Sequence, residues 1–304
     1  MSNDKVIKAY HLKTADGQVW SFIATKGTTK IVDLAASIMG LKEGFVPCSK
    51  RIIYVVSDKE KMDQAVSPPI GSDPELNNIS PNGWQALKSG HLTIWVHREL
   101  PDIICEISSI EDNDLDLTRL ALSLYPLYYR VIISGGLPFH TALLEYRGKG
   151  VLITAKSGTG KTTCCRRVAQ PWQAICDDQA MIVRTTWGYM VHPYPTWSEY
   201  YEDRPKTSID VNRYLPLSGI FFLEQSLTDG VEPISAGRAA QSIYETSKCM
   251  FSRYTIYPDQ TEKNILYSAM FENACAISKE VPSYLLRASL DGRFYGEIEK
   301  VLDQ

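Results

Sequence analysis

A short glycine-containing run in the second half of the chain has residue types and a spacing suited to binding phosphate. Residues 155–162 read Ala-Lys-Ser-Gly-Thr-Gly-Lys-Thr, which fits the phosphate-loop pattern with Ala in place of the usual first Gly. Small residues let main-chain N–H groups turn inward around phosphate oxygens, and the start of a following helix adds partial positive charge. Lys161 can reach the outer phosphates, and the Thr162 hydroxyl can bind Mg²⁺. The residues expected to bind a nucleotide are Ala155, Lys156, Ser157, Gly158, Thr159, Gly160, Lys161, Thr162 and Thr163. The alternative is a glycine-rich strand-to-helix turn with a surface lysine.

Two adjacent acids follow the next apolar stretch of the chain. Trp172 to Cys176 has the composition of a strand, and Asp177-Asp178 stands directly after it. At the carboxyl end of a strand neighbouring the loop, these carboxylates would face the phosphates. One acid can help to hold Mg²⁺ and the other can accept a proton from an attacking hydroxyl group. The order within the pair is open, and the alternative is a polar turn that contains two aspartates.

Two histidines are further candidates for the site. His140 precedes a predicted strand pair that leads to the loop, and the chain can return it to the phosphates through that hairpin. His192 directly precedes Pro193 in the segment Val191-His192-Pro193-Tyr194-Pro195, which we expect to be a loop restricted by its prolines. Each can equally be a structural residue.

The elements needed to position these groups can be predicted around them. An apolar strand, Val151 to Thr154, precedes the loop, and a helix, Thr163 to Ala169, follows it. We expect an α/β domain with a mixed sheet around the loop at residues 134–304, preceded by a smaller α+β domain at residues 1–133. In that first domain we expect one helix from Asp114 to Tyr129 and a long loop over residues 57–90.

Composition narrows the class of protein. With 304 residues, 44% of them hydrophobic, the chain can form more than one core, and a formal net charge of −3 does not suit a duplex-DNA-binding surface. No apolar run is long enough to span a membrane, and the N-terminus lacks an apolar signal segment. The seven cysteines form no C-x-x-C pair, which favours free thiols and a cytoplasmic location. We therefore expect neither nucleic acid nor a membrane as partner.

At the loop and the acid pair the chain resembles the HPr kinase/phosphorylase family. That family has a histidine ahead of a strand pair, then G-x-S-G-x-G-K-[ST], a short helix and an Asp-Asp pair, which match His140, residues 155–162 and Asp177-Asp178 here. Phosphoenolpyruvate carboxykinases share the loop and the acids more distantly. The chain is most similar to the HPr-kinase-related proteins of peptide-modification cassettes, in particular the SynChlorMet cassette protein ScmC family. It departs from HPr kinases in Ala155 and in lacking their Glu-rich, Arg-Gly stretch after residue 200, which leaves phosphorylase activity and HPr as acceptor open.

The resemblance implies a kinase that uses Mg²⁺ and ATP, or another nucleoside triphosphate, to phosphorylate a serine or threonine hydroxyl of a ribosomal peptide or small protein. Lys161 and Thr162 would bind nucleotide and metal, Asp177 would lie on the metal side, and Asp178 would act as base. His140 would lie at or next to the γ-phosphate. Two alternatives stay open: a nucleotide-binding scaffold that grips a leader peptide for other enzymes of a cassette, and a kinase for a small molecule such as free serine.

Several other residues have more than one interpretation. Arg238 and Arg253 are alternative candidates for a cation that stabilises the transferred phosphoryl group. Arg166-Arg167 is expected on a solvated helix face. The aromatic residues after the acids are expected in the core or in a lid, with peptide binding or base stacking as the alternative; they are Tyr194, Trp197, Tyr200 and Tyr201.

Overall fold

The computed structural model describes residues 8–47, 49–69, 82–97, 99–110, 112–156, 158–200, 208–252 and 259–303. The chain forms two compact units. The first comprises Met1–Pro126 with Trp197–Asn212 and Tyr254–Glu262, and the second comprises the remainder. The change from one unit to the other thus comes at Pro126, seven residues before the boundary at 133 that the sequence suggests (133 − 126 = 7), and later segments return to the first unit.

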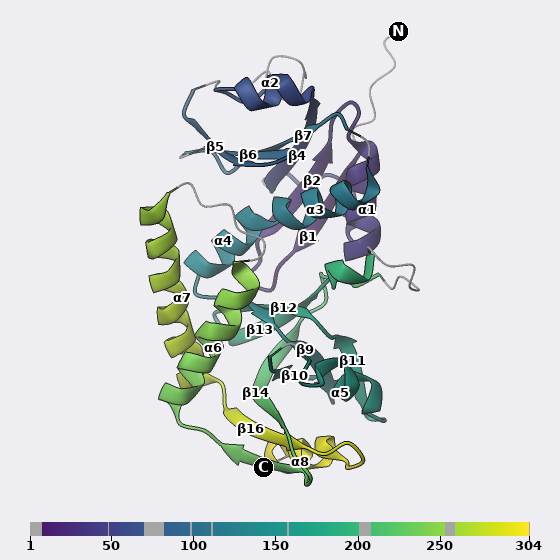
Figure 1. Ribbon diagram of the computed structural model, residues 1–304, viewed down its shortest axis with the longest axis vertical. Coiled ribbons are helices and arrows are strands. Elements are labelled where there is room, and N and C mark those ends of the chain that lie inside the picture. The colour runs from purple at the N-terminus through teal and green to yellow at the C-terminus, as the bar shows by residue number, and fades with distance from the viewer. Residues whose placement is uncertain are drawn as a thin grey trace. The chain divides into compact units, whose positions relative to one another are not determined.

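The first unit is a mixed sheet with helices against it (Figure 1). Its strands lie in the order β3-β1-β2-β4-β7-β6-β5, with β2, β4 and β7 parallel. Apolar side chains of these strands, including Ile53, Trp95 and Ile104, form a buried cluster. The elements are β1 (Ala9–Lys13), β2 (Val19–Ala24), α1 (Thr29–Met39), β3 (Lys42–Glu43), β4 (Lys50–Ser57), α2 (Lys59–Gln64), β5 (Trp84–Ser89), β6 (Leu92–His97), β7 (Ile103–Ser108), α3 (Asn113–Ser123) and the 3₁₀ helix η2 (Trp197–Tyr200).

Two predictions for this part of the chain are wrong. The expected loop at 57–90 contains α2 and β5, although its residues 70–81 lie outside the described part of the chain. The six residues of α2 include one apolar side chain, Met62, which is also its only buried residue. The sequence therefore has no apolar periodicity from which this helix could be predicted. The expected single helix from Asp114 is two helices, α3 and α4 (Tyr125–Ile133), because Pro126 has no N–H to continue α3 but fits the first turn of a new helix.

The second unit is built on a mixed sheet in the order β11-β9-β10-β14-β13-β12-β8, with β16 added beside β14. The long central strand β14 runs parallel to both β10 and β16. Figure 1 shows α6 and α7 side by side, and a ring contact between Tyr244 and Phe271 joins them. Besides α4, the elements are β8 (Leu137–His140), β9 (Ala142–Tyr146), β10 (Lys149–Thr154), α5 (Lys161–Arg167), β11 (Trp172–Cys176), β12 (Gln179–Thr185), β13 (Gly188–Tyr194), β14 (Leu215–Gln225), β15 (Gly230–Pro233), α6 (Ala236–Phe251), α7 (Gln260–Glu280), β16 (Ser283–Ala288) and α8 (Phe294–Leu302).

Two connections between consecutive strands bend at the same place in this sheet, which is called the corner of the sheet here. β8 passes into β9 through Thr141, and β11 passes into β12 through Asp177 and Asp178. β8 pairs with β12, and β9 pairs with β11, both antiparallel. The amide of Thr141 donates to the carbonyl of Asp178 at 3.0 Å, so the main-chain pairing continues through the bend. The two acids are therefore placed by the backbone of the sheet itself.

Candidate functional site

The loop between β10 and α5 has the backbone conformations that its glycines allow. Gly158 has φ 79° and Gly160 has φ 114°, both in the left-handed region. Among the described residues no side chain caps the start of α5, and its first turn holds no acid, so no carboxylate there opposes the binding of an anion. Lys161 is buried, and its Nζ donates to the carbonyl of Ala155 at 2.9 Å, across the base of the loop.

The remaining loop residues are accessible. Lys156, Thr162 and Thr163 are exposed, and Thr159 is half-buried with its amide donating to the carbonyl of Lys156 at 3.3 Å. Ser157 lies outside the described residues. The hydroxyl of Thr162 is thus open at the first turn of α5, on the element that also carries Lys161.

His140 and Asp178 meet at the corner of the sheet. The Nδ1 of His140 lies 2.9 Å from the main-chain carbonyl of Asp178 and 3.1 Å from its Oδ1. Because a carbonyl oxygen can only accept, Nδ1 carries the proton. The Nε2 atom of His140 is buried and has no hydrogen-bond partner in the part of the chain that the structure describes. The carbonyl of His140 in turn accepts from the Thr154 hydroxyl at 2.9 Å, which ties this pair to the end of β10.

Asp177 directly follows the last residue of β11 and has surroundings different from those of Asp178. Its Oδ1 accepts from the Thr196 hydroxyl at 3.1 Å. Burial, and then the charge of Asp177, raise the pKa of the Cys165 thiol in α5. Burial likewise raises the pKa of Cys176, which directly precedes the acids, to about 12. The Cys165 thiol also donates to the carbonyl of Cys176 at 3.9 Å, so the end of β11 that precedes Asp177 lies beside α5.

The strand that carries the acids is not the immediate neighbour of β10, contrary to expectation. β9 lies between β11 and β10, and it runs antiparallel to both. β11 and β10 therefore point in the same direction, and their carboxyl ends lie at the same edge of the sheet. The acids reach the loop edge through this arrangement, one strand further away than the sequence suggests.

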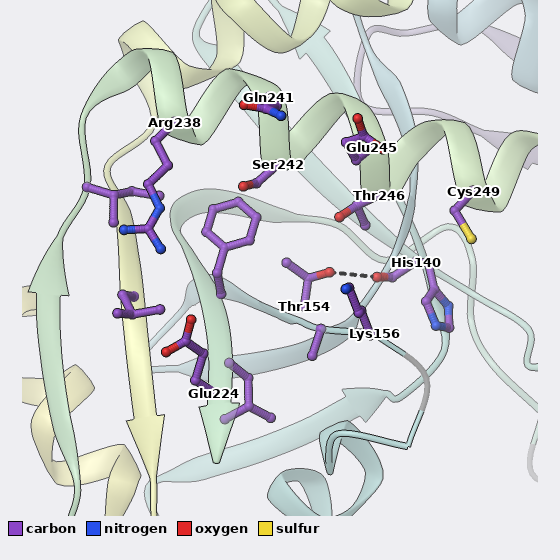
Figure 2. Close-up of a pocket in the computed structure, with 15 residues that line it drawn as sticks. His140, Thr154, Lys156, Glu224, Arg238, Gln241, Ser242, Glu245, Thr246 and Cys249 are labelled. Atoms are coloured by element: carbon purple, nitrogen blue, oxygen red, sulfur yellow. Dashed lines mark hydrogen bonds between the residues drawn. The ribbon is translucent and has the colours of Figure 1, made fainter. Parts of the chain in front are cut away.

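A hollow of about 610 Å³ opens beside the first half of the loop and is called the α6 hollow here. Figure 2 shows one wall formed by α6, with Arg238 pointing into the hollow, and the facing side formed by Lys156 and by Glu224 at the end of β14. His140 also lines it. Lys156, Glu224 and Arg238 form no ion pair or side-chain hydrogen bond with any described residue. Glu245 of α6 also lines the hollow, so the α6 hollow presents two cations, Lys156 and Arg238, and two carboxylates to a ligand.

Glu224 is a candidate that the sequence patterns did not single out. It follows the apolar run Ile220 to Leu223, so an acid directly after a buried strand was the available signal. Arg238 lines the α6 hollow, whereas Arg253 lies outside the described residues.

The other candidates are structural where the structure describes them. His192 is fully buried within β13 beside the ring of Tyr214, so its segment is a strand and not the expected loop. Arg167 is not simply solvated, because it donates to the carbonyl of Ser289 at 2.7 Å. The aromatic residues that are described, Tyr194, Trp197 and Tyr200, are buried, as the core interpretation predicts, and Tyr201 lies outside the described residues.

The donor set fits a magnesium ion that is shared with phosphate. Among the described residues, no three His, Cys, Asp or Glu side chains gather into a metal site. Mg²⁺ bound with nucleotides commonly takes only one or two protein oxygens besides phosphate and water. The Thr162 hydroxyl and the Asp177 carboxylate are oxygen ligands of that kind.

No helix in the described part of the chain has the length and apolar character needed to cross a membrane.

Comparison with known protein families places the second half of the chain and its flanking residues in a family. The model of the family described as SynChlorMet cassette protein ScmC matches residues 103–303. This range contains the loop, the acid pair and the α6 hollow. No curated protein matches the chain.

Proposed function

The chain belongs to the SynChlorMet cassette protein ScmC family, and from that premise we propose that it is an ATP-dependent kinase of the HPr-kinase-like type. Its acceptor would be a serine or threonine hydroxyl of a ribosomal peptide or small protein handled by the same cassette. The observation that carries the proposal is the meeting of three features at one edge of the sheet: the 155–162 loop, the His140–Asp178 pair and the α6 hollow with its available charges.

Each group has a place in an in-line transfer. The loop amides and Lys161 hold the phosphates, and Lys161 exchanges the Ala155 carbonyl for a phosphate oxygen. Asp178 takes the proton of the acceptor hydroxyl. At the same time the oxygen of that hydroxyl forms a bond to the γ-phosphorus. The bond from that phosphorus to the β–γ bridging oxygen breaks, and the nucleoside diphosphate leaves. His140 holds Asp178 through its Nδ1, and Arg238 compensates negative charge on the group in transfer.

Magnesium would be held by the hydroxyl of Thr162 and the carboxylate of Asp177. When bound, the ion neutralises charge on the phosphate oxygens. Asp177 suits this role better than Asp178, because Asp178 is the acid engaged by His140.

A kinase for a small zwitterion such as free serine is the second candidate function. It is favoured by the α6 hollow, where Glu224 can bind an ammonium group and Arg238 can bind a carboxylate. In the third candidate function, the chain is a nucleotide-binding scaffold that grips a leader peptide and transfers no phosphoryl group.

One experiment separates the three functions. The purified chain is incubated with Mg²⁺ and ATP, together with the peptides of its cassette in one reaction and free serine in another, and the products are measured by mass spectrometry. A gain of one phosphate on a peptide, lost in Asp178→Asn, supports the peptide kinase. Phosphoserine alone supports the small-molecule kinase, and slow ATP hydrolysis with no phosphorylated product supports the scaffold.

A further inference from the structure

A second hollow borders the later half of the loop. It has a volume of about 480 Å³ and is lined by Gly158, Thr159 and Gly160, by Thr163, and by the segments that follow β14 and β16. The Nε2 of Gln225 at the end of β14 donates to the carbonyl of Thr159 at 3.2 Å, which joins the strand to the loop. Because β10, β14 and β16 are parallel, the hollow lies outside three carboxyl strand ends, where α/β sheets bind ligands.

Two leucines on the rim of this hollow are almost fully exposed. Leu227, in the turn after β14, is 97% exposed, and Leu290, after β16, is 80% exposed. Exposed leucines contribute little to folding, and two of them at one ligand-sized hollow form an apolar surface that a flat ring can cover.

Hydrogen bonds hold the two turns that carry these leucines in place. Arg167 donates to the carbonyl of Ser289 at 2.7 Å, and the Oδ1 of Asp229 accepts from the Ser289 amide at 2.7 Å. The amide of Ser226 donates to the carbonyl of Ala288 at 3.0 Å and so links the two turns. Since Arg167 donates its hydrogen bond to the turn after β16, its role is to hold that turn in place. The two apolar tips are therefore positioned before any ligand arrives.

We propose that this hollow is the nucleoside subsite of the chain, where Leu227 and Leu290 contact the purine base of a bound nucleoside triphosphate. The inference rests on the proposed function, because the loop must hold the phosphates. The occupant follows from continuity: Gly158, Thr159 and Gly160 belong both to the phosphate loop and to the lining of the hollow. A triphosphate on the loop therefore directs its nucleoside into the adjoining space, whose volume is within the range of small-ligand sites.

Calorimetry with two ligands tests the subsite. Mg²⁺-ATP and Mg²⁺-tripolyphosphate are titrated into the unaltered chain, into the double variant Leu227→Ser with Leu290→Ser, and into Trp187→Ser as a control. Trp187 is 88% exposed and lies in the turn between β12 and β13. Because all three side chains are exposed, the variants are expected to fold. The double variant should bind ATP at least about 10-fold more weakly and bind tripolyphosphate within about twofold of the unaltered chain. The control should match the unaltered chain for both ligands.

The other outcomes are distinguishable. If the double variant binds ATP as tightly as the unaltered chain, the subsite is overturned and the kinase proposal stays in place. The same conclusion follows if the double variant loses equal affinity for ATP and for tripolyphosphate. Binding of neither ligand to the unaltered chain overturns the kinase proposal and the subsite together. As an independent measurement, photolabelling with 8-azido-ATP should mark peptides that contain residues 225–229 or 288–292. Labelling confined to other peptides overturns the subsite.

Discussion

His140 and Asp178 are joined at two points: the Nδ1 of the imidazole reaches both the main-chain carbonyl of Asp178, at 2.9 Å, and its Oδ1, at 3.1 Å. The carbonyl contact fixes the ring and the carboxylate contact fixes the acid. This pairing positions Asp178 at the loop edge of the sheet, while Asp177, one residue earlier, accepts a hydrogen bond from Thr196 in the segment between β13 and η2. Two neighbouring acids thus have separate surroundings, and their proposed roles can be tested separately.

Asp178→Asn should abolish phosphoryl transfer and leave nucleotide binding intact. The amide cannot accept the acceptor proton, and loss of a general base typically costs about 10²–10⁴-fold in rate. Single-turnover transfer and ATP calorimetry measure the two effects. Asp177→Asn is the control, with a raised Mg²⁺ requirement expected instead. Transfer at the normal rate by Asp178→Asn would remove this residue from the base role.

Lys161→Met should reduce turnover far more than stability. The substitution keeps the buried aliphatic stem but removes the charge that we propose to bind the phosphates, and we expect a loss of about 10²-fold or more in turnover. The hydrogen bond to the Ala155 carbonyl is also lost, at a cost below about 2 kcal/mol of unfolding free energy. Urea unfolding and steady-state kinetics compare the two. A stability loss without a turnover loss would make Lys161 a structural residue.

Gly158→Ala and Gly148→Ala form a matched pair. Both glycines have φ 79°, and a Cβ on either would meet no atom within 4 Å, so each alanine should cost about 1 kcal/mol of stability through backbone strain alone. Only Gly158 lies in the loop, so only Gly158→Ala should weaken ATP binding. Thermal unfolding and calorimetry of both variants give the comparison. Equal ATP affinities would show that the phosphates do not approach Gly158.

Arg238→Met should slow phosphoryl transfer by about 10-fold or more, with ATP affinity nearly unchanged, because its guanidinium has no partner among the described residues and lines the α6 hollow. Arg166→Met, on an exposed position of α5, is the control. Rapid-quench kinetics and calorimetry separate the two effects. If ATP affinity falls as much as the transfer rate, Arg238 binds the nucleotide in its ground state.

We expect the exposed cysteine Cys249 to react with a thiol reagent and the buried cysteines Cys164 and Cys176 to be protected. Burial raises the pKa of Cys164 to about 11 and that of Cys176 to about 12, so both stay protonated at pH 8 and form thiolates only as the pH rises toward those values. Cys249 is exposed and lines the α6 hollow. Iodoacetamide at pH 8 should modify Cys249 and spare Cys164 and Cys176, as peptide mass spectrometry will show. A bound acceptor should slow the reaction of Cys249.

The sequence is most informative where local pattern decides the structure. The strand Trp172–Cys176 is predicted with its observed bounds, because a proline and an acid pair delimit it. α6 and α7 are not predicted, although their sequences carry a helical signal. The buried residues of α7, Leu266, Met270, Ala274 and Ile277, recur every three or four positions, and those of α6 have a similar spacing. Strand order is not a local property, so neither the position of β9 between β10 and β11 nor the meeting of Glu224 with Arg238 at one hollow follows from spacing.

The shared bend of β8–β9 and β11–β12 has a consequence for how this protein can change. Main-chain pairing places the acids there, so replacing a side chain at the bend leaves the neighbouring positions where they are. Adding or deleting one residue would instead turn every following side chain to the opposite face of the sheet. For the kinase proposed here, new acceptor preferences are therefore expected to arise by substitution along α6, while changes of length should be confined to surface turns such as the one at Gly148.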